Sequence, residues 1–127
     1  MDTAVTAGIE VSVDSFFLEE ESEPERNHYT FAYRVRVKNL GTATVQLISR
    51  HWIITDSDGA VKEVKGDGVV GKQPVISAGE EFEYVSGSHL ETPLGTMEGT
   101  YRMTGEGGEL FDVKIPMFTL QVPGTLN

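Results

Sequence analysis

The segment 28-HYTFAYRVRVKNL-40 decides the fold class, because residues that favour a core alternate along it with polar or small ones. One face would carry Tyr29, Phe31, Tyr33, Val35 and Val37, and the other Thr30, Ala32, Arg34, Arg36 and Lys38. Successive side chains of a strand point to opposite faces. The segment therefore predicts a long strand with one face in a hydrophobic core.

Similar patterns, separated by turns, predict strands along most of the remaining chain. They cover 9–17, 43–55, 60–64, 81–88, 96–104 and 109–122, the last holding one or two strands interrupted at Pro116. The turn 56-DSDG-59 joins two of them as a hairpin. No window shows a helical apolar stripe of three turns. Seven or eight antiparallel strands with frequent turns indicate an all-β sandwich or barrel, and we expect a small two-sheet sandwich.

Length and charge narrow the class of protein. At 127 residues the chain is expected to form one domain, 1–127, and it contains no cysteine for disulfides, thiolate zinc sites or nucleophiles. No signal peptide and no membrane-spanning run are apparent, so we expect a cytoplasmic protein without membrane insertion. The net charge of −10 argues against nucleic acid as a partner.

The stretch 66-GDGVVGKQP-74 matches G-x-G-x-x-G and most of a P-loop, motifs that hold phosphate at the start of a helix. Gln73 replaces the Ser or Thr of a P-loop, and Pro74 disfavours the required helix. We therefore expect an irregular loop between strands, either flexible or tightly curled. Glycine-rich backbone can still form an anion-binding nest without a helix. The candidate ligand-binding residues here are Gly66, Gly68, Gly71 and Lys72.

Arg50 and His51 lie beside the only tryptophan, Trp52, inside the strand expected at 43–55. In the structural interpretation Trp52 packs in the core and His51 makes a hydrogen bond. In the functional interpretation Arg50 and His51 belong to a binding face, so both join the candidate ligand-binding residues.

Other reactive side chains predict no site. The acidic run 19–25 is better explained as a solvated loop than as a weak magnesium site. The three histidines, His28, His51 and His89, lack the spacing of metal ligands. Ser86-Gly87-Ser88-His89 has neither the spacing nor the context of a nucleophile elbow. We expect no catalytic residue, no bound metal and no cofactor.

An ordered series of short motifs runs through much of the chain. They are 50-RHWIITD-56, 66-GDGVVGKQPVI-76, 79-GE-80, 82-FEY-84, 86-SG-87, 92-TP-93, 95-GTM-97 and 99-GTY-101. In these residues the chain resembles the ApaG family of small bacterial proteins. The resemblance implies an immunoglobulin-like, fibronectin-type-III-like sandwich, and a gene that commonly neighbours one for a diadenosine tetraphosphate hydrolase. It also implies a link to cobalt resistance and magnesium efflux, and related interaction domains in eukaryotic F-box proteins.

Two functional hypotheses follow from the residues and the resemblance. The first is a non-enzymatic binding module that presents a loop or sheet face to a protein partner. The second is a sensor that binds pyrophosphate or a nucleotide polyphosphate at the glycine-rich loop, with Lys72, Arg50 and His51 contributing. A soluble sandwich has no element that spans a bilayer, so any effect on ion efflux would act through a partner or a ligand.

Overall fold

The computed structural model describes residues 1–125, which form nine β-strands and two 3₁₀ turns. The strands are β1 (Asp2–Thr6), β2 (Ile9–Phe17), β3 (Tyr29–Asn39), β4 (Val45–Asp56), β5 (Val61–Asp67), β6 (Val75–Ile76), β7 (Glu81–Leu90), β8 (Leu94–Thr104) and β9 (Leu110–Gln121). The turns η1 (Glu19–Glu21) and η2 (Pro24–Arg26) carry the acidic run on an exposed connection. Among the described residues no helix is long and apolar enough to cross a membrane.

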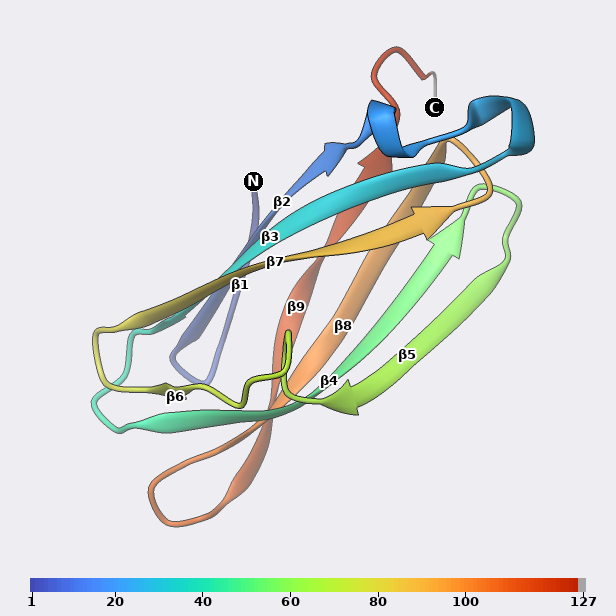
Figure 1. The fold of residues 1–127 in the computed structure, drawn as a ribbon. Coiled ribbons are helices and arrows are strands. Elements are labelled where there is room, and N and C mark those ends of the chain that lie inside the picture. The colour runs from blue at the N-terminus through green and yellow to red at the C-terminus, as the bar shows by residue number, and fades with distance from the viewer. Residues whose placement is uncertain (126–127) are drawn as a thin grey trace.

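The strands form two antiparallel sheets that pack face to face (Figure 1). One sheet has the order β1-β2-β3-β7, and the other has the order β5-β4-β8-β9, with β6 also paired to β4. The expected all-β, immunoglobulin-like or fibronectin-type-III-like sandwich is confirmed. The strand expected at 28–40 is β3, which lies between β2 and β7 and buries the predicted apolar face.

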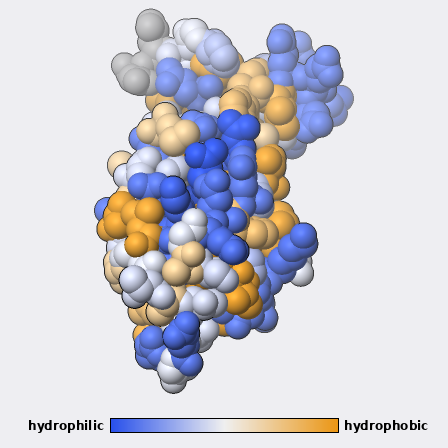
Figure 2. Space-filling model, turned by 90° about the vertical axis from the view of Figure 1, so that its left-hand side faces the viewer, coloured by the Kyte–Doolittle hydropathy of each residue, from blue (hydrophilic) through white to orange (hydrophobic). Residues whose placement is uncertain are grey.

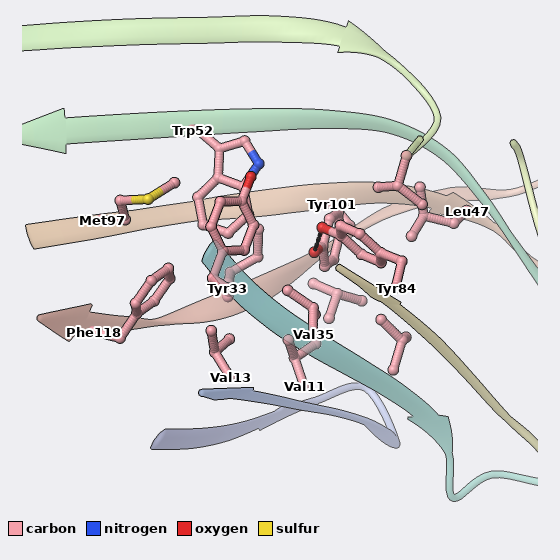
Figure 3. Packing of buried hydrophobic residues seen from close by; sticks show 14 of the residues in the cluster. Val11, Val13, Tyr33, Val35, Leu47, Trp52, Tyr84, Met97, Tyr101 and Phe118 are labelled. Atoms are coloured by element: carbon pink, nitrogen blue, oxygen red, sulfur yellow. Dashed lines mark hydrogen bonds between the residues drawn. The ribbon is translucent and has the colours of Figure 1, made fainter. Parts of the chain in front are cut away.

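Aromatic side chains from both sheets meet in the core (Figure 3). Trp52 of β4 makes edge-on contacts with Tyr33 of β3 and Phe118 of β9, at ring-centroid distances of 5.3 and 5.9 Å. Tyr84 of β7 and Tyr101 of β8 join their hydroxyl groups across the core in a hydrogen bond. Such pairs add to the free energy of burying their large apolar area.

Several strands differ from their expected extent. β1 and the two-residue β6 are additional, because pairing with β2 and β4 stabilises segments that are too short or too polar to show an apolar alternation. β5 continues to Asp67, since Gly66 and Asp67 pair with Arg50 and Ser49. The region 109–122 is one strand, and a register shift opposite Met97 and Gly99 accommodates Pro116. A bulge on an edge strand is where a β-sheet tolerates proline.

The two sides of the sandwich differ. On one side, which we call the closed side, β9 packs against β1 and β2, and the Thr6 hydroxyl accepts a hydrogen bond from the Lys114 N–H at 3.2 Å. On the other side, which we call the open side, β7 and β5 are the sheet edges, and no described strand joins them (Figure 1). On the molecular face seen in Figure 2, hydrophobic side chains lie in separate patches beside a hydrophilic band.

Candidate functional site

A bulge in β4 determines which side chains face the space between the sheets. Val45 and Leu47 point into the core, but the register with β8 shifts between Leu47 and Ser49. The extra residue reverses the alternation, so that Trp52 and Ile54 are buried beyond it. Arg50 shares their side and is half-buried between the sheets.

The Arg50 guanidinium lies across β5. Its Nη1 atom donates hydrogen bonds to the carbonyl oxygens of Asp67 and Gly68, at 3.0 and 2.9 Å. Gly66 pairs with Arg50 across the strands, and a Cβ at Gly66 would approach both Nη atoms to 2.9 Å. Glycine at position 66 therefore provides the space that the guanidinium occupies.

The remaining motif glycines form a tight hairpin. Val69 and Lys72 exchange backbone hydrogen bonds of 2.8 and 2.9 Å, and Val70 and Gly71 between them have φ angles of 43° and 78°. Two positive φ values are typical of a type I′ turn. Gly68 has a φ of 62°, and a Cβ there would lie 2.2 Å from the Lys72 carbonyl oxygen. Backbone geometry thus accounts for Gly68 and Gly71.

Three backbone donors of this loop are used within the fold. The Gly68 N–H donates to the Ile48 carbonyl at 2.7 Å, and those of Val69 and Lys72 bond within the hairpin. No helix follows, since β6 is extended and paired to β4. The exposed Lys72 side chain is not among the residues that line the hollow around Arg50.

Two adjoining hollows of about 340 and 290 Å³ lie between the sheets on the open side. Both are lined by Tyr33, Arg50, Trp52 and Ser86, and we call the combined space the inter-sheet cleft. The glycine hairpin and Tyr84 line one end of it, and Lys62, Ser88 and His89 line the other. A partly apolar recess with a few convergent polar groups is the usual form of a binding site.

The hydroxyl groups of the cleft are protonated donors. Burial raises the pKa of Tyr33 above 10, although a hydrogen bond with Ser86 and the charge of Arg50 oppose the change. Burial also raises the pKa of Tyr84, whose hydroxyl is hydrogen-bonded to that of the core residue Tyr101 (Figure 3). Neutral hydroxyls around one cation suit a carboxylate, a phosphate or a peptide carbonyl.

His51 lies on the opposite face of the same sheet. Its Nε2 atom is 3.0 Å from Glu63 Oε1. His51 borders another hollow, of about 460 Å³, which Arg50 and Gly66 also line. The structure therefore brings Arg50, Gly66, Gly68 and Gly71 together and separates His51 and Lys72 from the cleft.

Long-range pairing adds residues that the sequence did not indicate as a site. Ser86 pairs with Tyr33 and lines the cleft, although its only sequence signal was a rejected nucleophile motif. His28 and His89 stack with ring centroids 4.4 Å apart, because β3 begins beside the end of β7. Among the described residues no three His, Asp or Glu side chains are grouped to hold a metal ion.

Comparison with known proteins places the chain within a family. The ApaG domain model matches residues 19–105. Protein ApaG of Thiobacillus denitrificans is 53% identical over 119 residues, which cover 94% of each chain. Protein ApaG of Brucella anthropi is 54% identical over 123 residues, covering 97% of this chain and 95% of the relative.

A solved structure agrees with this assignment. The crystal structure of a putative ApaA protein from Bordetella pertussis superposes with a TM-score of 0.89 and is 51% identical in sequence. The match covers 92% of this chain and 95% of that one. The segment matched by the domain model holds the glycine hairpin, Arg50 and the other residues that line the inter-sheet cleft. The chain belongs to the ApaG family.

Proposed function

We propose that this chain is a non-enzymatic, cytoplasmic binding module that contacts a protein partner through the glycine hairpin and the adjoining inter-sheet cleft. Rigid paired strands hold the hairpin, as expected for a recognition loop on a sandwich. The links to cobalt resistance and magnesium efflux that the family resemblance implies would then be transmitted through that partner.

The observation that carries the proposal is the conformation of Val70 at the tip of the hairpin. Its φ of 43° is unfavourable for a β-branched residue, and 52% of its surface is exposed. Asn or Gly normally occupies this turn position. Residues held in strained conformations cluster at functional sites. A strained, exposed, apolar side chain at a loop tip is well explained if it contacts another protein.

The test uses the substitution Val70→Asn, which gives the turn its preferred Asn-Gly sequence. The free energy of unfolding should rise by about 1 kcal/mol, because Asn tolerates positive φ. Proteins captured from a cell lysate by wild-type chain should be lost with V70N. They should be retained with the control Val75→Asn, which alters an exposed valine of β6. Equal capture by V70N and wild type would contradict the proposal.

Arg50 supports a second candidate function, a sensor of pyrophosphate or a nucleotide polyphosphate. The guanidinium is half-buried and has hydrogen-bonding capacity beyond its two backbone contacts. Because Gly68, Val69 and Lys72 use their N–H groups within the fold, binding would rely on Arg50 and nearby hydroxyls. In an amide-resolved NMR titration with pyrophosphate, saturable shifts at Arg50, Ser86 and Asp67 would support this function. A flat titration would exclude it.

A further inference from the structure

The four edge strands of the sandwich are protected to different degrees. β1 and β9 pack against each other across the closed side. β5 presents charged residues along its edge, including Lys62, Glu63, Lys65 and Asp67, and such charges discourage pairing with another strand. In β7 the first half carries Glu81 and Glu83, whereas the second half, 85-VSGSH-89, contains no carboxylate, lysine or arginine.

The hydrogen-bonding phase of β7 follows from one contact beside β3. The Asn39 N–H donates to the Glu80 carbonyl at 2.9 Å, which marks a hydrogen-bonded pair. Such pairs alternate along an antiparallel ladder, so the register also makes Tyr33–Ser86 and Phe31–Ser88 hydrogen-bonded pairs. The residues between them, Val85, Gly87 and His89, therefore direct their N–H and C=O groups away from β3, toward the unpaired edge.

Two features of this half of β7 favour the approach of another backbone. Gly87 has no side chain, and glycine within a strand often marks a place where a ligand or chain comes close. Val85 leaves 58% of its surface exposed on an edge that no described strand covers. Ser86 and Ser88, on the other face of the strand, line the inter-sheet cleft with Arg50.

Arg50 differs from every other arginine in its ion pairing. Within the described residues Arg26, Arg34, Arg36 and Arg102 each have a carboxylate oxygen within 4.0 Å. Arg50, which is half-buried, has none, although the chain carries twenty acidic residues. The charged residues that line the cleft are Arg50, Lys62 and Asp67, and Arg50 contacts Asp67 through its backbone carbonyl rather than its carboxylate.

We propose that the Val85–His89 edge of β7 receives an extended, acidic segment of a partner protein as an added strand, with one of its carboxylates bound to Arg50. The added strand pairs with the outward N–H and C=O groups of Val85, Gly87 and His89. Alternate side chains of an added strand point into the cleft. A carboxylate at this position gives Arg50 the acidic ion-pair partner that it lacks within the described residues. This inference rests on the proposed function as a protein-binding module. The residues that carry it are those of the β7 edge and Arg50, whereas Val70 carries the proposed function.

The probe is a phage-displayed library of linear decapeptides, selected on the immobilised full chain. We expect the selected peptides to contain Asp or Glu within an alternating, strand-forming sequence. A synthetic copy should slow amide hydrogen exchange at Val85, Gly87 and His89 more than at Ser86 and Ser88, which already pair with β3. Replacing its acidic residue with the amide should weaken binding about tenfold or more.

Variants of the chain separate the two parts of the site. Gly87→Pro removes an outward N–H and should abolish peptide binding, and Val85→Lys, which charges the edge, should do the same. Arg50→Gln should weaken binding about tenfold or more, while Arg50→Lys restores part of it. Amide spectra and melting temperatures establish that each variant is folded.

Three outcomes would overturn the inference. They are selection of no peptide, undiminished binding to folded G87P and V85K, or protection that falls elsewhere on the chain. Shifts with pyrophosphate but not with peptide would assign Arg50 to a small anion instead. V75N, which alters an exposed residue outside the cleft, should still bind the peptide. Loss of cellular partners by V70N reports on the hairpin, and loss of the selected peptide by G87P reports on the β7 edge, so the two proposals can fail separately.

Discussion

The closed and open sides of this sandwich are built from similar strands but differ in how deeply their inward-facing residues are buried. On the closed side β9 lies against β1 and β2, and its inward residues Val113, Ile115 and Leu120 are fully buried. On the open side β5 and β7 remain apart, and Arg50, Ser86 and Val64 are only half-buried between them. The difference indicates that the closed side contributes more to stability and that the open side leaves polar groups partly accessible.

The largest expected effect tests which backbone N–H groups of β7 face β3 and which face the open edge. Ser86→Pro should lower the free energy of unfolding by at least about 3 kcal/mol, because it removes an N–H that faces β3 and leaves a carbonyl unpaired. Gly87→Pro should cost less than about 1 kcal/mol, since the N–H of Gly87 points away from the sheet. Urea denaturation of both variants measures the difference. Equal losses would mean that β7 is not an open edge at this point.

A matched pair of Val→Ala changes compares the two sides directly. Val113→Ala on β9 should lower the free energy of unfolding by about 2–3 kcal/mol, because it removes two fully buried methyl groups and leaves a cavity. Val64→Ala on β5 should lower it by about 1 kcal/mol or less, since Val64 is half-buried and borders the cleft. Thermal and urea unfolding give both values. Similar losses would show that the open side is packed as firmly as the closed side.

Gly66→Ala tests the space beneath Arg50. The added Cβ would lie within 3.0 Å of the guanidinium, so Arg50 must move from the carbonyl oxygens of Asp67 and Gly68. We expect a loss of about 1–2 kcal/mol in the free energy of unfolding, typical of overpacking. NMR shifts should extend to the Asp67 and Gly68 amides. The control Gly59→Ala has open space around its Cβ and should leave Arg50 unchanged, although its φ of 86° also costs stability.

The smallest expected effect is a pH dependence at the far end of the cleft. Burial lowers the pKa of His89 below 6.5, and the nearby His28 and Lys62 add to the change while Glu91 opposes it. Between the folded-state pKa and 6.5 the unfolded chain binds more protons, so stability is complete above about pH 6.5 and falls as the pH decreases. Melting temperatures at pH 7.5 and 5.5 should show a larger decrease for wild type than for His89→Gln. Because His89 is exposed, the difference should be small.

Much of the fold was predictable from local sequence. Alternation identified β3 because its inward residues are large and apolar, and the Asp-Gly turn at residues 58–59 identified the β4–β5 hairpin. β1 and β6 were not predicted, because their stability comes from pairing with β2 and β4 rather than from a buried face of their own. The strand order in the two sheets depends on contacts between distant segments, which no local pattern encodes.

The candidate site was only partly predictable for the same reason. The glycine spacing correctly indicated a tight loop, because positive φ is a local property of residues 68–71. Arg50 and His51 were grouped as one candidate binding face, but neighbours in a strand point to opposite faces. Both residues border the hollow of about 460 Å³, whereas only Arg50 lines the inter-sheet cleft. Lys72 belongs to the hairpin, but it is exposed and is not among the residues that line the cleft.

By itself the sequence determined that this chain folds as an all-β sandwich, because side-chain alternation and turn residues act over a few neighbours. The tertiary structure decided which residues face the open side. Continuing the alternation from Val45 and Leu47 would point His51 inward and Arg50 outward. The bulge at Ile48 reverses that order and brings Arg50 beside Tyr33 and Ser86. A bulge depends on the register between β4 and β8, which is set only when the two strands pair.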